Sequence, residues 1–126
     1  MGKVKVKRRT RKFKTQKGRG LDLYTILILD KDAPSPYLHW LIVNIPGKPI
    51  MNQRRIHGGT TLMKYTPPAP PLGERHHYHI SIYKQTFYIN HTDQINRVSF
   101  DVDLFVNQYD LQMISDVVKL LGRPSI

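Results

Sequence analysis

The chain has 126 residues, which allows one domain with a single modest core. It contains no cysteine, so disulfides, thiolate metal sites and cysteine nucleophiles are excluded, and a reducing, cytoplasmic compartment is the expectation. The apolar stretches are far shorter than the roughly 20 residues needed to cross a bilayer, so no transmembrane segment is expected.

Positive charge is concentrated at the N-terminus. Residues 1–19 hold ten of the twenty Lys and Arg and no acid, whereas residues 20–126 carry ten basic and nine acidic groups. We therefore divide the chain into a basic N-terminal arm (1–19) and a nearly neutral domain (20–126). The arm suits contact with RNA or an anionic membrane surface. The contacting residues would be Lys3, Lys5, Lys7, Arg8, Arg9, Arg11, Lys12, Lys14, Lys17 and Arg19. A solvated tail and an edge strand are the alternatives.

Three apolar runs along the chain predict strands. The first is Leu23–Leu29, and the second is Leu38–Ile45, which stops at a Pro-Gly turn dipeptide. Residues 46–75 contain six prolines and four glycines, so only short extended pieces are expected there. The third run, His76–Lys84, alternates apolar and polar side chains with the period of a strand.

The C-terminal part shows helical spacing instead. Asp101 is placed to cap a short helix through Asn107, and Asp110 to cap a second one. The second helix is predicted from the spacing of Leu111, Ile114, Val117, Val118 and Leu121. The fold class predicted from these patterns is mainly β, with short C-terminal helices.

Three segments in order resemble the phosphatidylethanolamine-binding protein family. They are Asp30–Ser35 directly after a hydrophobic strand, Tyr37–Gly47, and Pro70–Gly73 followed by His76-His77-Tyr78. The stretch Phe100–Leu111 resembles the helix that follows the family's core sheet. The resemblance implies antiparallel β-sheets in a Greek-key β-sandwich and a pocket for an anionic headgroup.

The resemblance places seven residues at or near this pocket. They are Asp30, Asp32, Pro34, Tyr37, His39, His76 and Tyr78. Histidines can donate to a phosphate or carboxylate, and a nearby acid fixes their tautomer and favours the cation. We assign Asp30 to orienting the site and Asp32 to the structure of the loop. The resemblance also makes the Ala33–Pro34 bond a candidate cis peptide.

The chain departs from the family pattern at three points. His77 stands where the family has an arginine, and Glu74 and Arg75 precede His76 where the family has small or apolar residues. The chain also ends at Ile126 without the closing strand and terminal helix that border the family's pocket. We therefore expect a domain truncated at its C-terminus and a more open site.

Other readings of these residues are weaker. A metal site lacks a fixed ligand spacing, although its candidate ligands are numerous: Asp30, Asp32, His39, His76, His77 and His79. A hydrolase would have only Ser35 as nucleophile, near Asp32 and His39. The sequence thus predicts a protein that is not an enzyme and needs neither cofactor nor metal.

The sequence is compatible with two functions. The first is a binding module for a phosphate or carboxylate headgroup, acting in signalling or inhibition by binding a protein partner. The alternative is a structural RNA-binding subunit of a ribonucleoprotein, anchored by the basic arm. Residues 37–47 also resemble the corresponding stretch of the mitochondrial ribosomal large-subunit protein of this fold, which makes mitochondria the alternative compartment.

Overall fold

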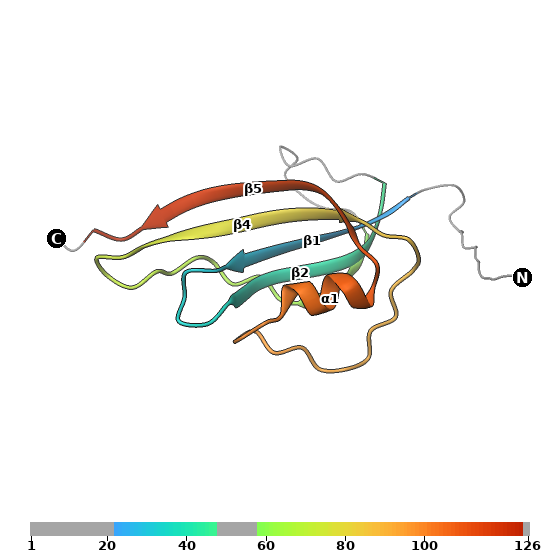
Figure 1. The fold of residues 1–126 in the computed structure, drawn as a ribbon, viewed down its shortest axis with the longest axis horizontal. Helices are drawn as coiled ribbons and strands as arrows, with labels where there is room; N and C mark the ends of the chain where they lie inside the picture. The colour runs from blue at the N-terminus through green and yellow to red at the C-terminus, as the bar shows by residue number, and fades with distance from the viewer. Residues whose placement is uncertain (1–21, 48–57, 125–126) are drawn as a thin grey trace, which may run out of the picture.

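The computed structural model describes residues 22–47 and 58–124. These ranges form five strands and one helix: β1 (Leu23–Asp30), β2 (Tyr37–Pro46), β3 (Thr60–Met63), β4 (Arg75–Lys84), α1 (Val102–Gln108) and β5 (Gln112–Gly122). The strands make one antiparallel sheet in the order β3-β2-β1-β4-β5. Figure 1 shows β2, β1, β4 and β5 side by side in this order. The predicted mainly β class is confirmed, as are the strands expected at the positions of β1, β2 and β4.

β1 is the central strand because it is apolar on both faces. Leu27 and Leu29 point to one face of the sheet and Ile26 to the other, and each is only 1% exposed. Strands buried on both sides read as continuous apolar runs, which explains the unbroken sequence of β1. β1 pairs with β2 along one edge and with β4 along the other, so it places residues from three strands next to one another.

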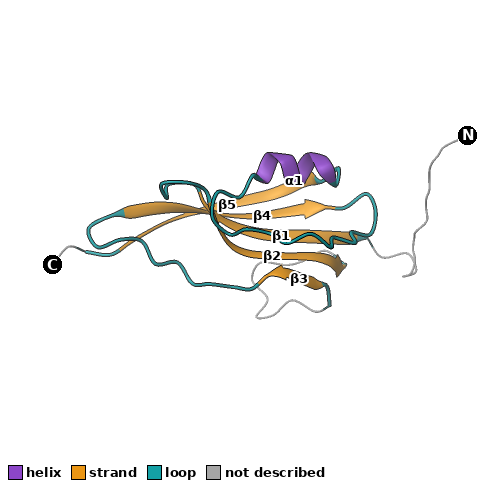
Figure 2. Ribbon diagram, turned by 90° about the horizontal axis from the view of Figure 1, so that it is seen from below, coloured by secondary structure: helices purple, strands orange, loops and turns teal. Residues whose placement is uncertain are grey.

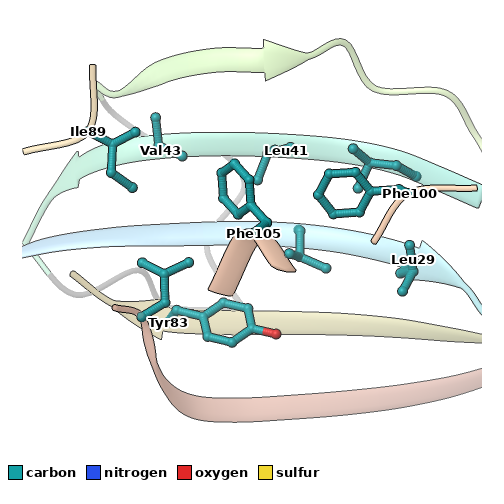
Figure 3. Packing of buried hydrophobic residues seen from close by; sticks show 10 residues of the cluster. Leu29, Leu41, Val43, Tyr83, Ile89, Phe100 and Phe105 are labelled. Atoms are coloured by element: carbon teal, nitrogen blue, oxygen red, sulfur yellow. The ribbon is translucent and has the colours of Figure 1, made fainter. Parts of the chain in front are cut away.

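The main core lies between the sheet and α1, which covers one face (Figure 2). Phe105 from α1, together with Phe100 and Ile89 from the preceding loop, packs over leucines of β1 and β2 (Figure 3). The side chain of Asp101 accepts a hydrogen bond from the backbone N–H of Leu104 at 3.0 Å, which confirms the predicted cap and helix.

A buried polar network fixes the end of the sheet where β2 and β4 finish. Asn44 has a φ of 60° at an irregularity in the β1–β2 pairing. Its side-chain oxygen accepts from Ile89 N at 2.8 Å and Gln85 Nε2 at 2.9 Å, and its Nδ2 donates to the Ile89 carbonyl at 2.7 Å. Thr25 Oγ1 donates to Gln85 Oε1 at 2.6 Å. This network ties β1, β2 and the loop after β4 together.

The second predicted helix is wrong. Residues 112–122 form the edge strand β5, which pairs with β4 from Arg75↔Gly122 to Lys84↔Gln112. Long-range pairing with a neighbouring strand has overridden the local helical spacing. The large apolar side chains of β5 are between 39% and 54% exposed, namely Met113, Ile114, Val117, Val118, Leu120 and Leu121.

Two further expectations can be compared with the structure. Every peptide bond between described residues is trans, so the candidate cis bond at Ala33–Pro34 is wrong. The basic arm lies outside the described residues. No helix in the described ranges has the length and apolar character needed to cross a membrane.

Candidate anion-binding site

Four strands bring a row of polar side chains to one end of the sheet. Asp30, at the end of β1, lies opposite Tyr37 of β2 and Tyr78 of β4. Tyr78 in turn lies opposite Lys119 of β5. Residues directly opposite each other in antiparallel strands share a face, so the row lies on one face of the sheet. Asp30 and Tyr78 are buried, with 4% and 2% of their surface exposed.

An irregularity in the pairing of β2 adds His39 to this row. Leu38 pairs with Leu29 and Trp40 pairs with Ile28, which leaves His39 as an extra residue. A bulge of this kind turns a side chain away from strict alternation. The ring of His39 accordingly makes edge contacts with Tyr37, at 4.8 Å between centroids, and with Tyr78, at 5.4 Å.

The tautomer of His39 follows from its hydrogen bond. Nδ1 lies 2.8 Å from the carbonyl oxygen of Thr66, which can only accept, so Nδ1 carries the proton. No hydrogen bond within the described residues uses Nε2. His39 thus has Nδ1 fixed by the backbone and, within the described residues, no hydrogen-bond partner at Nε2.

His76 is held between two carboxylates. Its Nδ1 lies 2.6 Å from Asp30 Oδ2, and its Nε2 lies 2.9 Å from Glu74 Oε1. Both acceptors are carboxylate oxygens, so both nitrogens donate and the ring is the imidazolium cation. The hydrogen bond to Asp30, with a further contribution from Glu74, raises the pKa of His76 above its ordinary value. The His76 side chain is 6% exposed, so in its protonated form it is a buried positive charge.

Asp30 also shapes the loop between β1 and β2. Its Oδ1 accepts from the backbone N–H groups of Asp32 at 2.9 Å and Ala33 at 3.2 Å. Because its other oxygen binds His76, Asp30 couples the loop conformation to the orientation of the histidine. Burial, with the nearby negative charge of Asp30, raises the pKa of Tyr78 to about 12, so its phenol stays protonated. We call Asp30, Tyr37, His39, His76 and Tyr78 the strand-end cluster.

Two of the seven predicted residues lie apart from the cluster. Asp32 contacts His77 instead of His76: its Oδ2 accepts from the backbone N of His77 at 2.8 Å and lies 2.6 Å from His77 Nδ1. The backbone bond first, and then the ring, lower the pKa of Asp32. Pro34 is exposed in the loop between β1 and β2. The structure therefore brings together five of the seven predicted residues.

Sequence reasoning missed three residues that contact or extend the cluster. Arg97 lies over the Tyr37 ring at 5.7 Å, and it donates to the carbonyls of Leu38 at 3.2 Å and Lys64 at 2.9 Å. Lys119 was missed because its segment was expected to be a helix. Glu74 was noticed as a departure from the family pattern, but nothing in the sequence gave its partner.

The described residues contain no group of three or more His, Cys, Asp or Glu side chains arranged to hold a metal ion. His77 and His79 each lie beside a single acid, and His76 lies between two. His79 Nδ1, for example, lies 3.2 Å from Asp116 Oδ2 on the helix-covered side.

Comparisons with known proteins agree with this architecture. A protein from Oryza sativa subsp. japonica, "Protein MOTHER of FT and TFL1 homolog 2", is 39% identical over 75 residues, covering 54% of this chain and 40% of that protein. The "Putative odorant-binding protein A5" of Drosophila melanogaster is 30% identical over 103 residues, covering 70% and 46%. The chain thus spans less than half the length of these curated relatives.

A solved structure shares the fold. A carboxypeptidase Y inhibitor, in complex with its cognate proteinase, superimposes with a TM-score of 0.65 at 22% identity, over 81% of this chain and 60% of that one. The family model described as "Phosphatidylethanolamine-binding protein" matches residues 10–118. That match covers most of the chain and includes the whole strand-end cluster, so the chain belongs to the phosphatidylethanolamine-binding protein family.

Proposed function

We propose that the strand-end cluster binds the phosphate or carboxylate group of a ligand. The observation that carries this proposal is a buried imidazolium, His76, on the same face as a second histidine, His39, with Tyr78 between them. The Nε2 atom of His39 has no hydrogen-bond partner among the described residues. Buried charges are costly unless they are paired, and a site built around one selects ligands of opposite charge. The proposed role is binding rather than catalysis.

Each member of the cluster has a distinct part in this proposal. His76 would donate to the anion, as would His39 through Nε2 once that nitrogen is also protonated, and Asp30 keeps His76 charged. The phenol of Tyr78, which stays neutral up to about pH 12, supplies a further hydrogen-bonding group without adding negative charge. Tyr37 packs against His39 and is itself covered by Arg97, so it fixes the ring of His39.

A titration of the full chain with O-phosphorylethanolamine and with inorganic phosphate tests this function. Affinity should fall as the pH rises from about 5.5 to 8, because imidazoles lose charge and donor capacity over that range. His39→Asn should weaken binding by about tenfold, the value of one good hydrogen bond to a charged group. His91→Asn is the matched control, since the His91 ring contacts Phe105 and Tyr109 and no member of the strand-end cluster. Equal binding by both variants, or no binding by the wild type, would refute the proposal.

The proposed biological role is regulation through a protein partner. A solved neighbour with this fold is an inhibitor seen bound to its proteinase, and that likeness supports partner binding here. Since the chain spans less than half of its curated relatives, partner binding has to be tested on this chain itself. A pull-down with the wild type and with His39→Asn, quantified by mass spectrometry, would show whether partner binding depends on the cluster.

A second candidate function is favoured by the segregation of charge. Ten basic residues lie in the 19-residue arm, and the remainder of the chain is nearly neutral. We propose that any affinity for RNA resides in the arm and is electrostatic, with a log–log salt slope of about −0.7 for each phosphate contact on single strands. Deletion of residues 1–19 should abolish RNA binding, whereas His39→Asn should leave it unchanged. RNA binding retained by the truncated chain would overturn this candidate.

A further inference from the structure

The contact between Glu74 and His76 is a feature that sequence reasoning did not anticipate. Glu74 is the only glutamate in the chain, and it lies immediately before β4. Its backbone is fixed, because its N–H donates to the Pro71 carbonyl at 3.0 Å and its carbonyl accepts from Arg123 N at 3.2 Å. Its side chain is 57% exposed, although its carboxylate reaches the buried ring of His76. An exposed side chain on a fixed backbone therefore binds a buried cation.

The two nitrogens of His76 differ in how readily a ligand could displace their hydrogen-bond partners. Nδ1 is bound to Asp30, whose carboxylate is buried and also holds two backbone N–H groups of the loop. Among the described residues, Nε2 is bound only to the exposed carboxylate of Glu74. Any anion that takes a hydrogen bond from His76 must therefore use Nε2, at the place where Glu74 Oε1 now lies 2.9 Å away.

We infer that Glu74 is an internal competitor, which occupies the position on His76 that the anionic group of a ligand takes. This inference rests on the proposed anion-binding function and specifies how access to the site is controlled. A carboxylate oxygen and a phosphate oxygen make the same charge-assisted bond to an imidazolium. The ligand gains only the difference between its own contact and that of Glu74, so the wild-type site binds anions weakly.

The local charge balance points the same way. With Glu74 in place, one cation faces two carboxylates, so the surroundings of His76 carry a net negative charge that repels a second anion. When Glu74 moves into solvent, Asp30 and His76 form a neutral pair, and an arriving anion meets an imidazolium N–H with no competing acceptor. Glu74 would thus set both the affinity and the charge preference of the site.

The test compares the wild-type chain with Glu74→Ala, Glu74→Gln and Asp93→Asn. Asp93 is exposed in the loop after β4, so its change alters net charge equally without touching the cluster. Inorganic phosphate and O-phosphorylethanolamine are titrated separately, because the first lacks the organic part of a lipid headgroup. We expect Glu74→Ala to bind both about tenfold tighter than the wild type, with Glu74→Gln intermediate and Asp93→Asn unchanged.

NMR of the His76 imidazole provides a readout that does not depend on ligand. Loss of Glu74 should lower the pKa of His76, and phosphate should reproduce in Glu74→Ala the ring shifts that Glu74 causes in the wild type. If the wild type binds phosphate and Glu74→Ala binds it equally well or more weakly, the competitor role is overturned and the proposed function stands. Absence of binding in all four proteins would overturn both. An equal gain in affinity in Asp93→Asn would also overturn the competitor role, because the change in net charge would then explain the effect.

Discussion

Replacing Asp30 should destabilise the fold and change its dependence on pH. Asp30→Asn keeps one side-chain oxygen for the backbone N–H groups of the loop, but its amide nitrogen cannot accept from His76 Nδ1. A hydrogen bond to a charged group contributes about 1.5–3 kcal/mol, so a loss of about 2–3 kcal/mol is expected. Asp30→Ala also removes the two backbone contacts, which raises the expected loss to about 4–5 kcal/mol.

The pH dependence follows from the raised pKa of His76. A histidine with a raised folded-state pKa stabilises the fold fully below its unfolded value of about 6.5, and this contribution is lost as the pH rises through the folded value. The cost of Asp30→Asn should therefore be larger at about pH 5.5 than at about pH 8.5. Urea unfolding followed by the fluorescence of Trp40, the single tryptophan, measures both values.

The matched control is Asp32→Asn, which also removes a carboxylate paired with a histidine. That pair is exposed, with side-chain exposures of 53% for His77 and 40% for Asp32, so its loss should cost much less. Two results would refute the reasoning: equal losses for Asp30→Asn and Asp32→Asn, or a loss for Asp30→Asn that does not change with pH.

Three further predictions concern other parts of the molecule. Asn44→Ala should cost about 3–5 kcal/mol in urea unfolding, from the left-handed backbone and the two unsatisfied groups of Ile89, and Asn44→Gly should cost about 1 kcal/mol less. Equal losses would contradict the backbone contribution. Phe105→Ala should cost about 3–5 kcal/mol. Leu104→Ala, on the exposed side of the same helix, should stay within about 0.5 kcal/mol. Tyr78→Phe should remove a step near pH 12 from the alkaline absorbance titration, and its persistence would show that another tyrosine is responsible.

The strands could be predicted where their apolar pattern is undisturbed. β1 is apolar on both faces and β4 alternates, so both were identified to within one residue at each end. β5 was mistaken for a helix because its pairing is irregular: Ile82 pairs with Ser115 and Tyr83 with Met113, which leaves Ile114 extra. One extra residue reverses the alternation, and the remaining apolar positions then match helical spacing.

The sequence was sufficient to predict which residues form the site, but not which hydrogen-bond partners they have. The loop and strand motifs indicated Asp30, His39 and His76, because each lies in a recognisable segment. The contact of Glu74 with His76 depends on how the exposed side chain bends back across the start of β4, which no spacing in the sequence encodes. The bulge that presents His39 likewise depends on the register between β1 and β2.

The order of the strands has a consequence for folding kinetics. β1 and β2 are consecutive and form a hairpin, whereas β1 and β4 join segments far apart in sequence, with Asp30 and His76 separated by 46 positions. Contacts of high sequence separation form slowly because loop closure has to precede them. The β1–β4 pairing is therefore expected to be a late step.

The strand-end cluster lies across this late junction, with Asp30 and His39 on one side and His76 and Tyr78 on the other. An anion bridging the two histidines would hold together segments that separate on unfolding, and it would bind only the closed sheet. Contacts expected to form late in folding contribute little to the transition state, so such a ligand should slow unfolding and leave the folding rate nearly unchanged.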